Sequence, residues 1–480
     1  MAFLLTQLLE GAGGTIPLGS ITVTGINANS NDVSPGEAFF ALPGTRVHGE
    51  AFIRQAVENG AKVIVSDRRP EGDPGVDIVV VDDVRRIYAQ AAARMMQPQP
   101  SVSVAVTGTN GKTSVASFVR QIWQANNIAG ASVGTLGIDV AGRLMPGTLT
   151  TPDPLSLHKT LAVLKAGGTD HVVIEASSHG LEQRRLDGIS FKAVGFTNID
   201  RDHLDYHGDL ETYRNAKLRL FTELLAADGA AVINTDHPQH DAFMFAALDR
   251  GVTLLTVGTD GAYFEISSVE REGYGQKVTG RLVGEPVEFT LPLAGRFQVD
   301  NAVMAAALAL QSGAEIDETI RALGKLKGAK GRMELVGQRG DAAIFVDYSH
   351  KPVALQSALE ALRPYATGRL AVVFGCGGDR DRGKRPMMGE IAVQLADKVI
   401  VTDDNPRTED AAGIRREIMA AAPGAIEIGD RGEAIAAAVA DLADGDVLLV
   451  AGKGHEDYQI VGTEKRPFSD HEAIGQALKR

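Results

Sequence analysis

Short apolar runs and amphipathic stretches alternate along most of this chain. The clearest case is the segment from Val102 to Trp123, which reads VSVAVTGTNGKTSVASFVRQIW. Valines alternate with small residues up to a glycine turn. After the turn, apolar residues recur at the spacing of one helix face, namely Val115, Phe118, Val119, Ile122 and Trp123. The pattern predicts a buried strand, a turn and an amphipathic helix with one buried face.

The region before this segment has the pattern of a small α/β domain. Between Ile21 and Val81 we expect short strands at ITVTGI, AFFAL, KVIVS and DIVVV, with a helix between Gly49 and Asn59. A helix-like stretch, DVRRIYAQAAARMM, follows, and the proline-broken joint QPQPS at residues 97–101 ends it. We therefore place the first domain at residues 1–97.

Two further α/β domains are expected after this joint. Residues 98–330 alternate strand and helix signals, which is typical of a mostly parallel sheet covered on both faces. A period of two between Tyr263 and Leu293 predicts an antiparallel subsheet attached to it. In residues 331–480 four strand signals are each followed at once by a polar cluster, in DYSH, GCGGDR, DDNPR and GKGHED. Open α/β sheets bind ligands beyond the carboxyl ends of their strands, so this Rossmann-like domain should carry a second ligand site.

Composition narrows the classes of function. With 480 residues, 44% of them apolar, the chain can form about three separate cores. A formal charge of −13 argues against nucleic acid as a partner, because binding a polyanion needs clustered lysine and arginine. The single cysteine, Cys376, and the absence of zinc-type spacing favour a reducing compartment, the cytoplasm. The N-terminal MAFLLTQLLEG has no basic region, and no stretch approaches ~20 apolar residues, so neither export nor membrane insertion is expected.

The turn GTNGKT has the residues of a phosphate-binding loop. Its glycines let backbone N–H groups point at an anion at the positive end of the helix, where Lys112 would reach the terminal phosphates and the Thr113 hydroxyl would ligate Mg²⁺. The loop is shorter than the GxxxxGK[ST] pattern, since Val106 stands where that pattern has its first glycine. An ordinary glycine turn is the alternative. The lysine and threonine favour a site for a nucleoside triphosphate, made by Gly108, Thr109, Asn110, Gly111, Lys112, Thr113 and Ser114.

Two further segments of the central domain carry candidate metal ligands. Glu175 ends a buried strand in HVVIEASS, where a carboxylate needs a cation, and either the Mg²⁺ of the phosphate site or an arginine can supply it. The run RDHLDYHGDLETYRNAK, residues 201–217, follows the next strand and contains His203, which we interpret as a ligand to a second Mg²⁺. A merely solvated loop is the alternative for this run.

Residues around the start of the third domain can complete a nucleotide site. Asn301, early in the helix of GRFQVDN, is a weak candidate on its own. Arg332 in GRME stands at the domain junction, and Asp347 and His350 in DYSH follow a strand. Domain closure would bring these residues to a nucleotide held by the central domain.

Together these segments resemble the Mur ligases. GTNGKT, EASSHG, NIDRDHLDYHGD, GRFQVDN, GRME and DYSHKP occur in the family's order over nearly the whole chain. GCGGDRDRGKRP, DDNPR and AGKGHEDYQ are similar to the members that add meso-diaminopimelate to UDP-N-acetylmuramoyl-L-alanyl-D-glutamate. The resemblance implies an ATP-dependent, amide-forming ligase of peptidoglycan precursor synthesis, acting as a monomer.

The resemblance also implies roles for single residues. ATP and Mg²⁺ would be bound by the residues named above, with Lys112, Glu175, His203 and Lys217 as the catalytic set. Lys217 would carry a carbamate, an oxygen ligand beside His203, although the residues alone indicate a surface helix lysine there. The UDP-sugar dipeptide would bind to Ser30, Thr45, Arg46, Val47, Thr150, Thr151, Ser177, Gln183 and Arg185. The chain departs from the family at Asn29 and Asn31, where aspartate and arginine are common, and at Leu149, where asparagine is often found.

The same resemblance assigns the C-terminal domain to meso-diaminopimelate, through Arg380, Asp404, Asn405, Pro406, Arg407, Gly452 and Glu456. This amino acid differs from lysine by a second carboxylate, which a guanidinium can hold with two parallel hydrogen bonds. Arg407 is therefore the candidate for selectivity and Glu456 the candidate for the distal ammonium. For an isolated arginine, a solvated loop charge is the alternative.

Three other functions stay open at this point. A related ligase could add lysine or glutamate instead. A small-molecule kinase would release ADP without any dependence on an amine, and a nucleotide-dependent switch would show negligible turnover. A ligase should release phosphate only when both of its other substrates are present.

Overall fold

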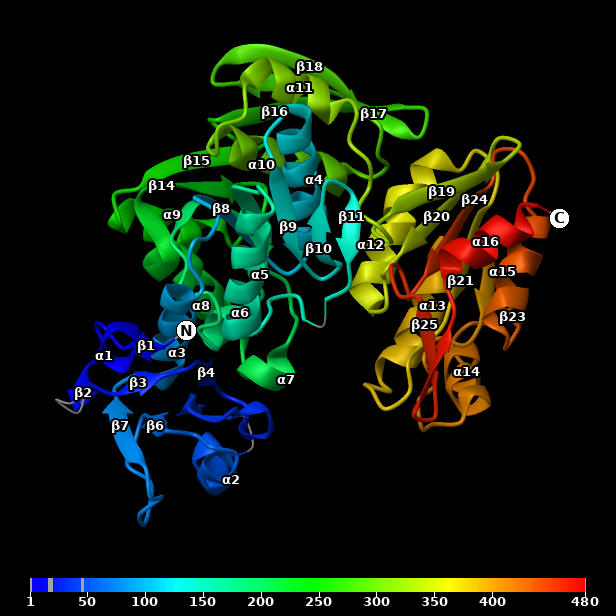
Figure 1. The fold of residues 1–480 in the computed structure, drawn as a ribbon. Helices are drawn as coiled ribbons and strands as arrows, with labels where there is room; N and C mark the ends of the chain where they lie inside the picture. The colour runs from blue at the N-terminus through cyan, green and yellow to red at the C-terminus, as the bar shows by residue number, and fades with distance from the viewer. Residues whose placement is uncertain (1, 16–19, 45–46, 148, 480) are drawn as a thin grey trace. The chain divides into compact units, whose positions relative to one another are not determined.

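The computed structural model describes residues 2–15, 20–44, 47–147 and 149–479. The described residues form a mixed α/β fold with three sheets of five or more strands, which confirms the predicted fold class (Figure 1). It divides into two compact units, residues 1–265 with 303–319 and residues 266–302 with 320–480. The finer division at residues 97 and 330 stays a prediction. Among the described residues, no helix is both long and apolar enough to cross a membrane.

The N-terminal part is a five-stranded sheet in the order β2-β7-β6-β5-β4, with the pair β1–β3 beside it. Strands β4 to β7 are parallel, and β2 is antiparallel to β7. One sheet face packs on α1 and α3, and the other on α2. The elements are β1 (Phe3–Leu4), α1 (Leu5–Leu8), β2 (Gly14–Thr15), β3 (Thr22–Val23), β4 (Ile26–Asn27), β5 (Ala38–Ala41), α2 (Ile53–Glu58), β6 (Val63–Ser66), β7 (Asp77–Val81) and α3 (Val84–Met95).

The central sheet has eleven strands in the order β11-β10-β9-β12-β8-β13-β14-β15-β16-β17-β18. Strands β9, β12, β8, β13, β14 and β15 are parallel, as predicted for this region. Strands β17 and β18 are antiparallel, which agrees with the predicted subsheet. The antiparallel extension β9-β10-β11 was not predicted. The strands are β8 (Val102–Thr107), β9 (Gly130–Gly134), β10 (Gly137–Val140), β11 (Arg143–Met145), β12 (His171–Glu175), β13 (Phe191–Phe196), β14 (Leu225–Asn234), β15 (Thr253–Gly258), β16 (Phe264–Glu272), β17 (Gly275–Leu282) and β18 (Glu285–Leu291).

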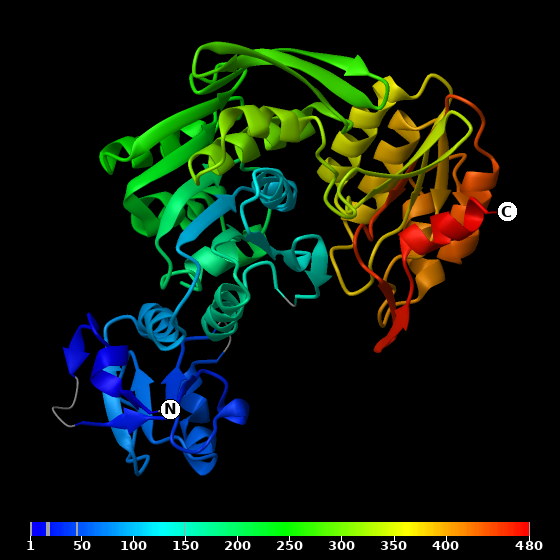
Figure 2. The same cartoon turned by 45° about the horizontal axis from the view of Figure 1, so that its top comes forward.

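Helices cover both faces of the parallel strands. On one face α5, α6, α8 and α9 share a core with alternate residues of the strands, such as Val172 and Ile174 of β12. On the other face α4 packs against β8, β9 and β12, and Figure 2 shows this helix nearly end-on beside the strands. Its buried positions include all five apolar residues that the sequence pattern placed on one face. The helices are α4 (Lys112–Ala125), α5 (Pro154–Ala166), α6 (Ser178–Glu182), α7 (Leu204–His207), α8 (Leu210–Arg219), α9 (His240–Asp249), α10 (Arg296–Leu310) and α11 (Ile316–Leu323).

The C-terminal sheet has six strands in the order β19-β20-β24-β21-β22-β23. Strands β20 to β24 are parallel, so the four polar clusters lie at one edge of the sheet, while β19 is antiparallel. Helices α12 to α14 cover one face, and α15 and α16 the other. The elements are β19 (Glu334–Arg339), β20 (Ala342–Asp347), α12 (Pro352–Leu362), β21 (Leu370–Phe374), α13 (Lys384–Leu395), β22 (Lys398–Val401), α14 (Ala411–Met419), β23 (Ile426–Glu427), α15 (Arg431–Ala440), β24 (Val447–Ala451), β25 (Tyr458–Val461), β26 (Glu464–Pro467) and α16 (Asp470–Ala477).

Candidate functional site

The phosphate-loop prediction matches the local structure between β8 and α4. Gly111 caps the helix with a φ of 86°, a left-handed conformation that glycine adopts without strain. The backbone at Gly108 lies so close to Thr197 that an added Cβ would be 1.9 Å from the Thr197 hydroxyl. Lys112 folds back and donates to the carbonyls of Gly108 at 2.7 Å and Thr109 at 2.9 Å. The loop therefore holds a lysine charge over its backbone at a helix N-terminus, where anions are favoured.

Glu175 lies at the carboxyl end of β12 and is almost fully buried. Its carboxylate accepts from the Thr113 hydroxyl at 2.9 Å, from the Thr135 N–H at 2.9 Å and from the Thr135 hydroxyl at 3.0 Å. The partners of Glu175 in the structure are thus hydroxyl and amide groups. The sequence had left an arginine open as the alternative partner. An added Cβ at Gly134 would lie 2.0 Å from Glu175 Oε1, so the end of β9 must be glycine to make room.

The surface position that the residues alone indicated for Lys217 is wrong. The side chain is 1% exposed on α8, and its Nζ donates to the Gly108 carbonyl at 2.8 Å. Burial, and next the charge of Lys112, hold the pKa of Lys217 well below its usual value. Two lysines therefore meet at one backbone carbonyl, and burial shifts one of them toward its neutral form.

His203 precedes α7 with a φ of 53°, and its ring lies 4.8 Å from that of His179 and 3.6 Å from the Asp202 carboxylate, Nε2 to Oδ2. Asp209 caps α8 by accepting from the Thr212 N–H. Within the described ranges, no three histidine, cysteine or acidic side chains gather as metal ligands. An oxygen donor of another kind, the Thr113 hydroxyl, lies next to Glu175.

The predicted UDP-sugar dipeptide residues form two groups. In the central part a chain of hydrogen bonds links them to Glu175: Thr135 contacts Thr150, Thr151 donates to the Glu175 carbonyl and contacts Ser177, and Arg185 contacts both Thr151 and Gln183. Thr135 was missed in the sequence. Its only signal is a hydroxyl residue directly after the strand GASVG.

In the N-terminal part Ser30 is buried and donates to Gln55, while Gln55 donates to Asn31 and Asn29 binds Asp32. Of the two asparagines that depart from the family, Asn31 therefore connects the loop to α2, and Asn29 forms a hydrogen bond within the loop. Val47 is half exposed, and Thr45 and Arg46 lie outside the described residues.

The remaining nucleotide candidates belong to the second unit. Asn301 is buried on α10, and the Arg332 guanidinium lies 4.6 Å above the Tyr348 ring. The Asp347 carboxylate accepts from the N–H groups of Met333 at 2.7 Å and Ser349 at 2.8 Å. Burial lowers the pKa of His350 to about 4, so its imidazole is neutral at pH 7.

Most of the predicted amino-acid residues meet at the edge of the C-terminal sheet. Asn405 donates to Glu456 at 3.0 Å, and Arg407 donates to the Gly378 carbonyl at 2.8 Å. A Cβ at Gly452 would lie 2.9 Å from an Asp404 oxygen, so these two residues are also in contact. Arg380 is exposed, and Pro406 lies directly before Arg407 in the same loop. An added Cβ at Gly377 would lie 2.7 Å from Arg407 Nη1 and 3.9 Å from Arg380 Cγ, so both arginines flank that glycine.

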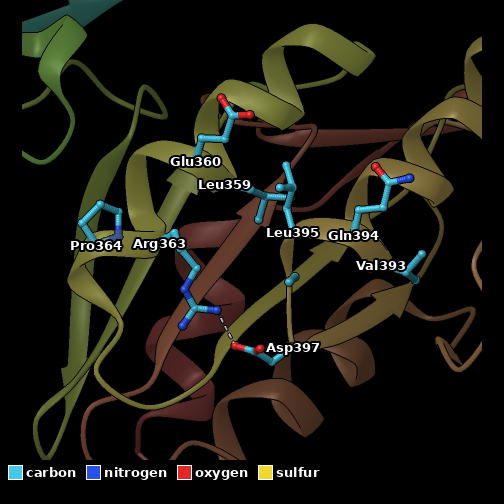
Figure 3. A pocket seen from close by; sticks show the side chains of 9 residues that line it. Leu359, Glu360, Arg363, Pro364, Val393, Gln394, Leu395 and Asp397 are labelled. Carbon is cyan, nitrogen blue, oxygen red and sulfur yellow. Dashed lines mark hydrogen bonds and ion pairs between the residues drawn. The ribbon is translucent and has the colours of Figure 1, made fainter.

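A separate hollow of about 570 Å³ lies elsewhere on this unit, between the carboxyl ends of α12 and α13 (Figure 3). The ion pair Arg363–Asp397, at 2.5 Å, closes one side of it. Asp397 comes directly before β22, at the opposite end of that strand from the DDNPR loop. The hollow is therefore not part of the predicted amino-acid site.

Comparisons with known proteins show the family of the chain. The Mur ligase family, catalytic domain, matches residues 22–100, the Mur ligase middle domain matches 106–309, and the Mur ligase, glutamate ligase domain matches 331–454. A UDP-N-acetylmuramoyl-L-alanyl-D-glutamate–2,6-diaminopimelate ligase of Agrobacterium fabrum (strain C58) is 52% identical over 96% of this chain and 94% of that protein. The chain belongs to the Mur ligases.

Other relatives of this Mur ligase carry the same name. One of Mesorhizobium japonicum is 50% identical over 98% of this chain and 99% of that protein. A solved structure of a UDP-N-acetylmuramoyl-L-alanyl-D-glutamate–2,6-diaminopimelate ligase is 32% identical, with a TM-score of 0.75, covering 100% of this chain and 99% of that one. Every candidate site of this Mur ligase therefore lies within the length shared with these proteins.

Proposed function

We propose that this Mur ligase joins meso-diaminopimelate to UDP-N-acetylmuramoyl-L-alanyl-D-glutamate at the expense of ATP. The observation that carries the proposal is the near full-length similarity to relatives named for this reaction. Amide formation from a carboxylate and an amine is uphill in water. A D-glutamyl carboxylate would therefore first attack the terminal phosphorus of ATP, forming an acyl phosphate and releasing ADP.

In the second step the amine of meso-diaminopimelate attacks the acyl carbon. The tetrahedral adduct loses phosphate and a proton, and an amide remains. Lys112 is the residue that would hold the terminal phosphate, because its ammonium lies over the loop at the N-terminus of α4. The hydrogen-bond chain from Thr113 through Glu175 and Thr135 to Thr150 supports a dipeptide end bound next to this phosphate site.

Mg²⁺ fits the donor set of the first unit. Thr113 and Glu175 present oxygens within 2.9 Å of each other, and hard cations prefer oxygen. These residues would hold one ion, and His203 with a carbamate on Lys217 would hold another. When bound, the ions would neutralise charge on the phosphates that are being transferred.

A carbamate on Lys217 would also resolve the meeting of two lysines at Gly108. The neutral amine that burial favours is the form that reacts with CO₂, with loss of one proton, to give a carbamate anion. The Lys112 ammonium would then face a negative group where it now faces an amine. The low pKa supports this modification on grounds separate from the family.

In the C-terminal domain the roles follow from charge. Arg407 would hold the second carboxylate of meso-diaminopimelate, and Glu456 its distal ammonium. The loop around Arg407 is fixed at both ends of that residue, because its N–H donates to Ile460 at 3.0 Å and its carbonyl accepts from Gly462 at 2.7 Å. A fixed backbone suits a residue that must discriminate between two similar amino acids.

Phosphate release tests the proposal against its alternatives. The protein is supplied with ATP, Mg²⁺ and UDP-N-acetylmuramoyl-L-alanyl-D-glutamate, plus meso-diaminopimelate, lysine or glutamate in turn. We expect release only with meso-diaminopimelate. Release with lysine or glutamate instead would indicate the related ligases, ADP formation without any amine would indicate a kinase, and no turnover would indicate a switch.

A further inference from the structure

A lysine that sequence reasoning did not single out lies beneath the predicted amino-acid site. Lys453 follows β24 in the GKGHED loop, and its side chain is fully buried. Its Nζ donates to the side-chain oxygen of Asn405 at 3.0 Å and to the backbone carbonyl of Tyr458 at 2.8 Å. The ammonium thus joins the DDNPR loop to the first strand of the β25–β26 hairpin.

Two carboxylates of the site also face this ammonium. Asp404 Oδ1 and Glu456 Oε2 each lie 3.6 Å from Lys453 Nζ. Arg431, a buried cation nearby, is already paired, because it donates to both oxygens of Asp470 at 2.7 and 2.8 Å. Lys453 is therefore shared by two carboxylates, and such a pair of negative groups suits a cationic ligand.

The same hydrogen bonds fix the orientation of the Asn405 side chain. Its oxygen accepts from Lys453 and also from the Ile460 N–H at 2.9 Å, and its nitrogen donates to Glu456 at 3.0 Å. Asn405 and Lys453 together orient the Glu456 carboxylate. Any change in Lys453 should therefore be transmitted to the carboxylate proposed for the distal ammonium.

We propose that Lys453 is a positioning residue for the amino-acid substrate, which holds Asn405, Asp404 and Glu456 so that their combined charge matches one substrate ammonium. The inference rests on the proposed function, because it concerns the same pocket. It differs from a purely structural role in what a substitution changes. Removing one partner of a buried ion pair leaves the other charges unmatched, and two carboxylates left without their shared cation repel each other, so the substitution should change substrate affinity as well as stability.

The test compares Lys453→Met and Lys453→Arg with Lys398→Met. Lys398 is a control lysine at the start of β22, at the opposite end of that strand from the DDNPR loop, and is paired with Asp441 at 2.6 Å. For each variant the KM for meso-diaminopimelate, the KM for ATP and kcat are measured. Lys453→Met should raise the KM for meso-diaminopimelate at least tenfold and leave that for ATP within twofold. Lys453→Arg should recover part of the loss, and Lys398→Met should behave as wild type.

Binding of meso-diaminopimelate measured by calorimetry, and of an ATP analogue as a folding check, keeps the test decisive if turnover is low. Lys453→Met that binds both ligands as wild type does would overturn the inference. The fold-loss in affinity for meso-diaminopimelate in the double variant Lys453→Met/Glu456→Gln should be smaller than the product of the fold-losses in the two single variants. A double variant whose loss equals that product would also overturn the inference. Failure of wild type to use meso-diaminopimelate would instead refute the proposed function.

Discussion

At the scale of single residues, the two predicted catalytic lysines of the first unit meet at the carbonyl of Gly108. Lys112 and Lys217 both donate to it, although their charges repel. A repulsive pair of this kind is costly in a buried place unless one member is neutral or changes sign. The arrangement makes sense if Lys112 is matched to phosphate and Lys217 is modified.

We expect Lys217→Ala to lower ligation about 100-fold or more, because it removes an anionic group next to the phosphate loop. Added acetate or formate should restore part of the activity by occupying the same place. The measurement is phosphate release with increasing carboxylate concentration. An intact mass for native protein without an added CO₂, at full activity, would contradict the carbamate.

Arg407→Ala should lower the use of meso-diaminopimelate by at least about 30-fold, since truncating one partner of a buried charge pair costs roughly 2–5 kcal/mol. It should also abolish the preference over lysine. Arg407→Lys is the matched variant, and it should not recover the preference because an ammonium cannot form two parallel hydrogen bonds. Competition between the two amino acids measures this directly, and an unchanged preference would assign the second carboxylate to another residue.

Part of the site could be predicted from the sequence because its signals are local. The strand, turn and helix around Lys112 are encoded in one continuous segment, and the structure has them where the pattern placed them. Lys217, Thr135 and Lys453 gave no such signal. Their positions depend on contacts with Gly108, Glu175 and Asn405, each at least 40 residues away in the sequence. Burial produced by distant segments is not visible in a local pattern.

At the scale of elements, the strand β9 must end without a side chain. We expect Gly134→Ala to lower activity roughly 100-fold, because its Cβ would displace the Glu175 carboxylate from Thr113 and Thr135. Gly167→Ala is the control, since its Cβ would meet atoms only at 3.4 Å. Equal activity of the two variants would show that the position of Glu175 is not critical.

Helix α5 gives the first unit a dependence on pH. Burial lowers the pKa of His158 to about 4, while its Nδ1 contacts Gln99 at 3.0 Å. The unfolded chain binds this proton near pH 6.5, before the folded chain does, so stability is complete above that pH and falls as the pH drops toward 4. Between pH 7 and pH 5 the loss is about 2 kcal/mol for this one group.

His158→Gln should remove this share of the acid sensitivity. The reporter is the only tryptophan, Trp123, which is fully buried on α4 of the same unit. Urea unfolding followed by its fluorescence at pH 7, 6 and 5 should show a smaller decline for the variant than for wild type. Identical declines would mean that other groups carry the effect.

The element pattern was also only partly predictable. Most of the parallel strands are continuous apolar runs and were predicted, although β9 and β23 were not. The other strands that were missed, β10, β11, β25 and β26, have few buried positions. Without a buried face a strand has no strict alternation for a pattern to detect. Two of these elements lie close to the site. Thr135, just before β10, donates to Glu175, and Ile460, on β25, donates to Asn405.

At the scale of the whole molecule, the predicted phosphate site and the predicted amino-acid site belong to different compact units with separate cores. Substitutions should therefore separate the two binding functions. Lys112→Ala should lose ATP binding and keep meso-diaminopimelate binding, and Arg407→Ala should do the reverse, while neither supports ligation. Calorimetry with each ligand checks this, and loss of both ligands in either variant would indicate that the units depend on each other for binding.

The one cysteine of the chain, Cys376, is buried against Met388, and burial raises the pKa of its thiol to about 12. Such a thiol is a poor nucleophile at neutral pH. Wild-type protein is therefore already a background for selective labelling, with no cysteine to remove. Cysteines introduced at the exposed positions Phe245 and Val353, one in each unit, would be the reactive thiols for a fluorophore pair. Energy transfer between the dyes would then report the separation of the two units in solution, with and without substrates.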